Sequence, residues 1–399
     1  MPPKPKIGNL SGVNGGDDNL KFALERVTDQ SAVEKLEPEM EELFERLPNP
    51  NPYLSTKWMF TWWKHFGNGK EPVVLVVRDA DGAMRAYWPF IEVSGVGGSG
   101  LWPWVNNHAN YSDPVADEDA PGCVELLLDG YHGLLEDYHF VWFPFLRETF
   151  WRRWLEPFLR DKPEPRIERI ARQVPIAVFP DSDFDAYWRS RQGPKSRKTF
   201  RYVERKLRER GEVRFVDCDS EKEIRTHLGA LCDLESRGWK QHEKVGLFSS
   251  KGARAFLFDL LPSLAAAGRL RLSFLFLDDE AIAGELGVLG KNTYGLHHLA
   301  YDEAYDCDSP GRQLLARNLR RCCEEGRRIF DFLPGANRYK RKLATEETTV
   351  RELHLFRRSL PGFLTRKSIE MNLRRRRKKR LARGVQSRAD RNAAEVLPD

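Results

Sequence analysis

The hydrophobic pattern of the chain is most regular between Arg269 and Lys342. Three apolar runs, rich in β-branched and aromatic residues, cover Leu270 to Leu277, Ala281 to Leu289 and Thr293 to Ala300. The links between them, Asp278-Asp279-Glu280 and Gly290-Lys291-Asn292, are short and polar, as in tight hairpins. The pattern predicts a three-stranded antiparallel meander.

The period then becomes helical. After the turn Asp308-Ser309-Pro310-Gly311, apolar positions recur from Leu314 to Cys322 at helical spacing, and Gly326 ends the helix. A run from Arg328 to Leu333 predicts a further strand, which stops at Pro334-Gly335. A turn that opens a helix presents unpaired N–H groups and a positive dipole end, which suit a phosphate. The alternative is that this turn is only a helix cap.

The first 170 residues repeat this order loosely, as helix, hairpin, helix and strand. The hairpin is the strongest signal, with Val73 to Arg78 and Met84 to Val93 around Asp79-Ala80-Asp81-Gly82. A segment rich in proline and charge, Asp161 to Arg169, predicts the linker between two α/β modules. We therefore expect a disordered N-terminus at 1–20, modules at 21–170 and 171–360, and a basic flexible tail at 361–399.

Charge is concentrated at the end of the chain. The 399 residues carry a net charge of +6 and are 41% hydrophobic, enough for two cores. From Arg366 onward twelve Arg or Lys face four Asp or Glu, so this part carries +8 and the remainder −2. The run Arg374 to Arg380 is basic at every position, which suits solvent, an anionic membrane surface or RNA phosphates.

A second basic feature lies in GPKSRKTFRYVERKLRERG, which predicts a helix. Phe200, Val203 and Leu207 make its apolar face, and eight cations share the other face with two glutamates. This face is either simply solvated or a contact for an anionic partner: a nucleotide 3′-phosphate, a lipid-linked phosphate or RNA.

Location and metal content follow from two further features. No run of 18 apolar residues occurs and the N-terminus lacks the apolar segment of a signal peptide, which predicts a cytoplasmic protein, with the tail allowing peripheral attachment to the inner membrane face. The six cysteines form no CxxC pair and have no histidine at zinc-binding spacing, so we expect no metal.

The order of these motifs resembles GNAT-type acyltransferases, in particular the branch of FemAB-like proteins and CelD-type proteins associated with cellulose biosynthesis. The motifs are the meander, Tyr301-Asp302, Ser309-Pro310-Gly311, the helix, Phe330 to Gly335 and Tyr339-Lys340, together with PYLSTKWMFTWWKHFG and the basic helix. The resemblance implies an α/β (α+β) fold of tandem GNAT-like modules, each a mixed, mostly antiparallel sheet flanked by helices. It also implies acetyl-CoA or another acyl-CoA as co-substrate, or aminoacyl-tRNA in the Fem branch.

The same resemblance implies where the co-substrate binds. Two strands, Thr293 to Ala300 and Ile329 to Leu333, would splay apart beside the pantetheine, and the turn would take the pyrophosphate. Its cofactor-binding residues would be Ser309, Gly311, Arg312 and Gln313, in a turn with fewer glycines than the family usually has. The substrate-binding residues would be Trp239, Lys240, Tyr301 and Lys340.

Transfer of an acyl group from a thioester needs a base for the nucleophile, donors for the oxyanion and an acid for the thiolate. No Ser-His-Asp order and no nucleophilic cysteine motif is present, so direct transfer is favoured. Glu285 and His298 are candidate bases; strand alternation would put His297 and His298 on opposite faces, with at most one in the cleft. Tyr339 is a candidate acid. Each of these residues could instead have a packing or surface role.

Asp331 lies between apolar neighbours on a predicted central strand, where a carboxylate is costly without a partner. We expect it to order Lys340 or Arg338, or to bind substrate. The function predicted is an acyl-CoA-dependent N- or O-acyltransferase acting on a cell-envelope sugar, amino sugar or polysaccharide precursor. The alternatives are a Fem-like aminoacyl-tRNA-dependent transferase and a catalytically degenerate scaffold recruited by its basic tail.

Overall fold

The computed structural model describes residues 22–67, 69–95, 98–105, 108–180, 183–237, 246–335 and 337–375. The predicted disordered N-terminus, 1–20, lies outside these ranges. The first half contains β1 (Phe22–Val27), α1 (Gln30–Lys35), α2 (Glu37–Arg46), η1 (Pro52–Leu54), α3 (Thr56–Trp62), η2 (Trp63–Gly67), β2 (Pro72–Asp79), β3 (Met84–Gly95), β4 (Gly98–Pro103), β5 (Val115–Ala116), α4 (Pro121–Gly133), η3 (Leu134–Glu136), β6 (Phe140–Arg147), α5 (Glu148–Phe150), η4 (Trp151–Leu155), α6 (Glu156–Leu159) and β7 (Arg166–Val178).

The second half contains a long basic helix, α8, and a long strand, β13. Its elements are α7 (Phe184–Arg191), α8 (Pro194–Arg210), β8 (Val213–Cys218), α9 (Glu221–Ser236), α11 (Lys251–Ala266), β9 (Leu270–Leu277), β10 (Glu280–Leu289), β11 (Thr293–Tyr301), η5 (Glu303–Asp308), α12 (Pro310–Glu324), β12 (Ile329–Asp331), α13 (Arg338–Leu343) and β13 (Glu346–Phe356). The predicted hairpin, meander, helix and following strand are all present.

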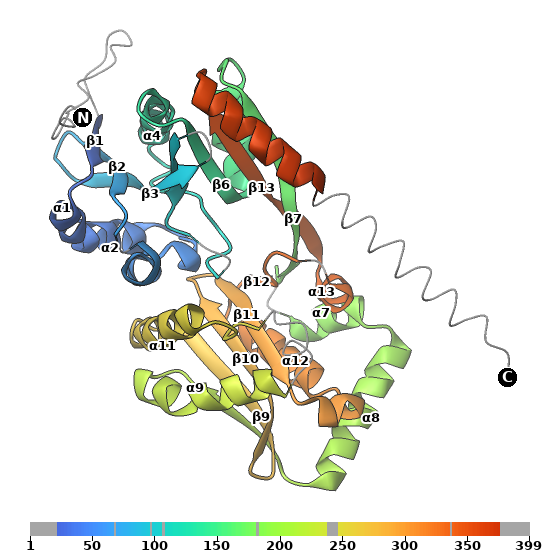
Figure 1. Cartoon of the computed structure of the whole chain (residues 1–399). Coiled ribbons are helices and arrows are strands. Elements are labelled where there is room, and N and C mark those ends of the chain that lie inside the picture. The colour runs from blue at the N-terminus through green and yellow to red at the C-terminus, as the bar shows by residue number, and fades with distance from the viewer. Residues whose placement is uncertain are drawn as a thin grey trace.

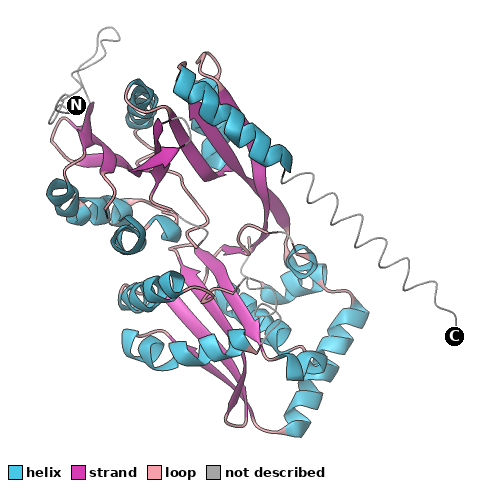
Figure 2. Cartoon of the chain, viewed as in Figure 1, coloured by secondary structure: helices cyan, strands magenta, loops and turns pink. Residues whose placement is uncertain are grey.

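One mixed, mostly antiparallel sheet runs through both halves, in the order β1-β2-β3-β4-β6-β13-β7-β12-β11-β10-β9-β8 (Figure 2). Four antiparallel strands form each end of this sheet, and each end is followed by one parallel pairing, β4 with β6 and β11 with β12. The two ends therefore repeat the same strand arrangement. The predicted tandem α/β architecture is confirmed.

In the middle of the sheet, each half contributes one strand that pairs with a strand of the other half. β7, from the end of the first half, pairs with β12 of the second, whereas β13, from the end of the second half, pairs with β6 of the first. β7 and β13 also pair with each other, from Glu346 opposite Ile176 to Leu355 opposite Arg166. Residues Arg166 to Arg169 belong to β7, so the prediction that they are part of a linker was wrong. The division at residue 170 falls inside this strand and stays a prediction.

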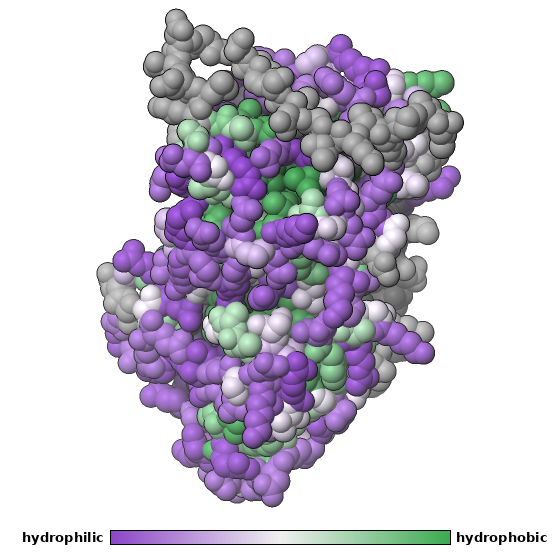
Figure 3. Space-filling model, turned by 90° about the vertical axis from the view of Figure 1, so that its left-hand side faces the viewer, coloured by the Kyte–Doolittle hydropathy of each residue, from purple (hydrophilic) through white to green (hydrophobic). Residues whose placement is uncertain are grey.

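Helices cover both faces of the sheet, and one hydrophobic cluster joins the halves (Figure 1). It contains Val33, Met40 and Trp58 of the first half together with Leu231 of α9 and Leu260 of α11. Separate clusters lie under α4 and under α7 with α12. On the face drawn in Figure 3, hydrophilic residues dominate and hydrophobic ones gather in a few patches.

Residues 360–375 form a further helix after β13. The prediction of a flexible tail from residue 361 was therefore wrong for this stretch, because the described part is helical. Residues 376–399, which hold most of the run Arg374 to Arg380, lie outside the described residues. Within the described ranges no helix combines the length and the apolar character needed to cross a membrane.

Candidate functional site

The parallel strands β11 and β12 pair over only three positions and then diverge. Thr293, Tyr294 and Gly295 lie opposite Ile329, Phe330 and Asp331, and β12 ends there while β11 continues to Tyr301. Beyond Gly295 no described strand pairs with this edge of β11.

The N-terminus of α12 lies beside the end of β11. Ser309, in the left-handed conformation with φ of 48°, turns the chain into the helix. A Cβ atom on Gly311 would lie 3.0 Å from Cδ1 of Tyr301, so glycine allows this close approach. Of the predicted cofactor-binding and substrate-binding residues, the structure brings together Ser309, Gly311, Arg312, Gln313 and Tyr301.

Arg312 is half-buried at this helix start and has no carboxylate partner among the described residues. Its guanidinium donates to Oε1 of Gln192 at 3.0 Å and to Oγ of Ser196 at 2.9 Å, and it lies over the Phe200 ring. Burial lowers the pKa of Arg312, since no anion offsets the desolvation of its charge. Gln313 is buried and its amide donates to the Asp308 carbonyl at 3.0 Å. This corner therefore presents positive charge.

Glu285 is fully buried on β10, facing α12. Burial raises the pKa of Glu285 to about 7, although the Tyr294 hydroxyl, which donates to Oε1 at 2.8 Å, and the Asn318 amide favour the ionised form. A Cβ on Gly287 would lie 2.2 Å from the Tyr294 hydroxyl, so this glycine makes room for the ring. A carboxyl that titrates near neutrality is suited to moving a proton.

Tyr339 starts the first turn of α13 and is 40% exposed. Burial of its hydroxyl raises its pKa, and the negative charge of Glu285 raises it further. The two residues are thus close enough to interact electrostatically. A tyrosine held protonated at neutral pH can donate a proton.

His298 lies on the other face of the sheet from Glu285. Its Nε2 is 2.9 Å from Oε1 of Glu235, on α9, and both side chains are buried. The Glu235 carboxylate also accepts from the backbone N–H groups of Leu247 and Phe248. Burial alone would raise the pKa of Glu235, but these contacts, with His298 foremost, lower it to about 2.

The expected alternation of His297 and His298 was wrong, because a β-bulge interrupts β11. Leu286 lies opposite His298, but the next residue, Gly287, lies opposite Leu296, which leaves His297 in the bulge. The His297 ring contacts Tyr53 and Trp58 of the shared core, against which His298 also packs through Phe248. The bulge lies where β11 has lost its β12 partner.

Asp331 ends β12 at the junction between the halves. It accepts from the Tyr111 hydroxyl at 2.5 Å and from the Leu333 backbone N–H at 2.7 Å. Burial raises the pKa of Asp331, while the charges of Lys340 and Arg147 lower it. The Lys340 ammonium donates to the Phe332 carbonyl and its charge acts on Asp331, which also accepts a hydrogen bond from Tyr111, a partner that was not predicted.

The sequence reasoning missed three residues that the structure puts in these clusters. Tyr111 comes from a loop 220 positions away from Asp331, and no local signal reveals that contact. Glu235 lies near the end of α9, and its partner His298 is more than 60 positions away in the sequence. Tyr294 could have been found, because a glycine at 287 inside a strand indicates that something bulky approaches it. Trp239 and Lys240, predicted to bind substrate, lie outside the described residues.

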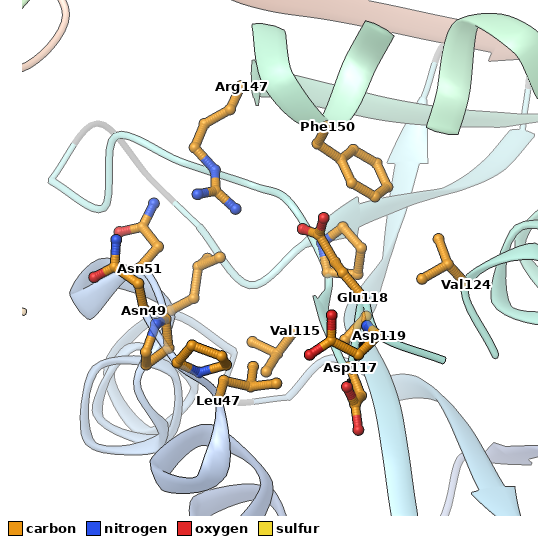
Figure 4. A pocket seen from close by; sticks show the side chains of 15 residues that line it. Leu47, Asn49, Asn51, Val115, Asp117, Glu118, Asp119, Val124, Arg147 and Phe150 are labelled. Carbon is orange, nitrogen blue, oxygen red and sulfur yellow. Dashed lines mark hydrogen bonds between the residues drawn. The ribbon is translucent and has the colours of Figure 1, made fainter. Parts of the chain in front are cut away.

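A pocket of about 210 Å³ opens in the first half, next to the loop that carries Tyr111 (Figure 4). Arg147 and Phe150 enter it from one side, Asn49 and Asn51 from another, and three carboxylates, Asp117, Glu118 and Asp119, from a third. The Arg147 guanidinium is bound through Nε to the buried Asp113 at 2.5 Å. Burial raises the pKa of both Tyr111 and Asp331, and the charge of the same guanidinium opposes that rise, so pocket and junction are electrostatically linked.

No group of three or more His, Cys, Asp or Glu side chains in the described ranges is arranged to hold a metal ion. The clusters around Glu285, His298 and Asp331 each contain groups that can carry a proton. They lie on the two faces of the sheet at β10 and β11 and, for Asp331, at the last position where β12 pairs with β11.

Comparison with known proteins gives one domain match and several similar solved structures. Residues 194–341 match the model of the acetyltransferase (GNAT) domain, and no curated sequence gives a match. The crystal structure of FemX is similar at 12% identity with a TM-score of 0.59, covering 83% of this chain and 97% of that one. The C-terminal domain of a protein described as a lysylphosphatidylglycerol synthetase, from Agrobacterium fabrum, is similar at 13% identity with a TM-score of 0.52, covering 83% and 95%. At such identities the likeness concerns the fold.

Proposed function

We propose that this chain, whose residues 194–341 match the acetyltransferase (GNAT) domain, moves an acyl group from acyl-CoA directly to an amine or hydroxyl of a cell-envelope sugar, amino sugar or polysaccharide precursor. One observation carries the proposal. The edge of β11 beside which β12 ends, after Gly295, leads to Tyr301, where it meets the start of α12 at Gly311. A ligand extended along that edge would therefore end beside the positive charge of Arg312 and of the α12 N-terminus.

The contacts at that corner suit a pyrophosphate. Gly311 presents its backbone beside Tyr301, and the dipole of the 15-residue helix α12 is positive here. Arg312 adds a guanidinium whose charge no described carboxylate neutralises. The thioester end of the same molecule would then lie toward the bulge at His297, beyond the last residue of β12.

In the reaction the acceptor nitrogen or oxygen attacks the thioester carbonyl, its proton passes to a base, and the C–S bond breaks with protonation of the thiolate. Tyr339 is assigned as the acid, because its raised pKa keeps it protonated and 40% of it is exposed. Glu285 is fully buried and so acts through Tyr339 rather than on the acceptor itself. Asp331 or His298 would receive the acceptor's proton.

The pocket in the first half is the proposed place for part of the acceptor. Asn49, Asn51, Glu118 and Asp119 supply planar polar groups of the kind that bind hydroxyl and amino groups, and Phe150 offers a ring face. Its link to the catalytic clusters is Arg147, whose charge acts on Asp331. An acceptor that occupied both the pocket and the catalytic clusters would contact residues of both halves of the chain.

A second candidate is the aminoacyl-tRNA-dependent transfer implied by the Fem-like resemblance. It is favoured by the fold shared with FemX and by α8, whose exposed face carries Lys195, Lys198, Arg201 and Arg205. In that case the positive corner at Arg312 would contact the end of a nucleic acid. The two candidates differ in the donor and share the transfer chemistry.

Calorimetry with acetyl-CoA and longer acyl-CoA tests the proposal. We expect binding that Arg312→Gln weakens by at least about tenfold, since charged hydrogen bonds are worth about 1.5–3 kcal/mol. Arg208→Gln, on the exposed end of α8, is the matched control and should bind normally. No binding of any acyl-CoA, together with salt-dependent binding of aminoacyl-tRNA, would replace the first candidate with the second.

A further inference from the structure

Helix 360–375 carries a stripe of hydrophobic side chains that nothing in the described chain covers. Leu360 is 71% exposed, Phe363 53%, Leu364 47% and Met371 53%. Their spacing of three, four and eleven residues from the first puts them on one helical face. Half of the eight exposed large hydrophobic residues of the described chain lie on this short segment, so the stripe is not a random scatter.

The opposite face of the helix is fixed to the protein. A Cβ on Gly362 would lie 2.3 Å from the Arg357 carbonyl oxygen and 3.2 Å from that of His139, so this glycine is packed tightly on backbone. Thr365, one turn on, is 4% exposed. The helix lies along the outside of β13 and β7 in Figure 1, drawn in red. The apolar stripe is therefore held facing outward.

Positive charge accompanies the stripe. The Lys367 ammonium lies 5.6 Å from the centroid of the Phe363 ring, within the same face. Arg374 and Arg375 are exposed at the end of the helix, and the sequence continues with cations to Arg380. Residues 366–399 carry a net charge of +8, against −2 for the rest of the chain.

We propose that helix 360–375 binds the surface of an anionic membrane, with its apolar stripe at the level of the headgroups and the first part of the acyl chains. Leu360, Phe363, Leu364 and Met371 would leave water, and Lys367, Arg374 and Arg375 would lie among lipid phosphates. Helices with an apolar face, a basic flank and no capacity to span bind membranes in this way. The enzyme is thereby a peripheral membrane protein, docked by this one helix.

The chemistry of the stripe argues against the other occupants. RNA binds cations and stacks its bases on aromatic rings, but three of the four residues are aliphatic and offer no ring. A second copy of the chain would bring a second +8 segment next to the first. A lipid surface satisfies both features, because it is apolar below and negative above.

Co-sedimentation of the whole protein with vesicles tests the proposal. Vesicles of phosphatidylcholine with about one quarter phosphatidylglycerol should bind the protein, and pure phosphatidylcholine much less. The double variant Phe363→Asp with Leu364→Asp should bind at least about tenfold more weakly, since it removes two apolar anchors and adds negative charge. Tyr202→Asp, at a residue 51% exposed on α8, is the matched control and should bind like the parent.

Met371→Asp, alone at the far end of the stripe, keeps the test valid if the double variant fails to fold, and its thermal melt should match that of the parent. Equal vesicle binding by parent and Met371→Asp would overturn the proposal. The proposal would also be overturned if the parent were a dimer in sedimentation velocity and the double variant a monomer. It would be overturned as well if the double variant lost RNA binding but kept vesicle binding.

Discussion

Replacing Glu285 with glutamine should make the protein more stable at alkaline pH. The carboxyl is fully buried on β10, and its pKa of about 7 lies well above the usual 4.5. Below pH 4.5 the carboxyl is protonated in both the folded and the unfolded chain. As the pH rises toward 7 the unfolded chain releases this proton while the folded chain retains it, so the free energy of unfolding falls.

The size of the effect follows from the two pKa values. A difference of roughly 2.5 pH units at 1.36 kcal/mol per unit corresponds to about 3 kcal/mol of stability, lost between pH 4.5 and 7. The amide introduced by Glu285→Gln keeps the shape of the carboxyl and cannot ionise. The stability of the variant relative to the parent should therefore rise by about 3 kcal/mol across this window and then level off.

Urea denaturation of both proteins from pH 4.5 to 8.5 measures that difference. Tyr294→Phe supplies a matched comparison, because loss of the hydroxyl that donates to Glu285 should raise the carboxyl's pKa further and move the window to higher pH. All other titrating groups are shared by the proteins. Curves for parent and Glu285→Gln that stay parallel over the whole range would refute the reasoning.

Three further outcomes are expected. Glu235→Gln should lower the free energy of unfolding by about 3 kcal/mol at pH 7, because it removes the carboxylate, with a pKa of about 2, that binds His298. This loss should shrink as the pH falls from 4.5 toward 2. Denaturation curves that show the same loss at every pH would contradict the prediction. Gly311→Ala should cost about 1 kcal/mol in thermal melts and weaken acyl-CoA binding, since its Cβ presses on Tyr301; unchanged affinity would move the cofactor elsewhere. Tyr339→Phe should lower kcat by about 10²-fold or more with little change in KM for acyl-CoA, and full activity in steady-state assays would remove Tyr339 as the acid.

Local pattern predicted most of the second half. The meander from Leu270 to Ala300 consists of three short apolar runs separated by polar turns, and α12 has a clear period of 3.6, so both could be predicted without the fold. β7 and β13 could not be placed in this way. Their alternating charged and apolar residues are compatible with any neighbouring strand, and the partner of each lies in the other half.

The candidate site was predictable only where its parts are close in sequence. Ser309, Gly311 and Arg312 are consecutive or nearly so, and the helix start brings them together. The bulge at His297 is a local irregularity that the pattern of apolar residues does not encode. The partner of Asp331, Tyr111, lies in the first half of the chain and could not be identified from the sequence around Asp331. The sequence did indicate that a buried carboxylate at this position requires a partner.

The strand exchange in the middle of the sheet orders events during synthesis. β6 is made early, but the strand that covers its free edge, β13, is completed only when Phe356 has been added. The first half thus emerges from the ribosome with an exposed edge, and it must wait through nearly the whole second half before that edge is closed. If the two halves were made as separate chains, each would have an unpaired strand edge, on β6 or on β12, whose partner strand belongs to the other chain.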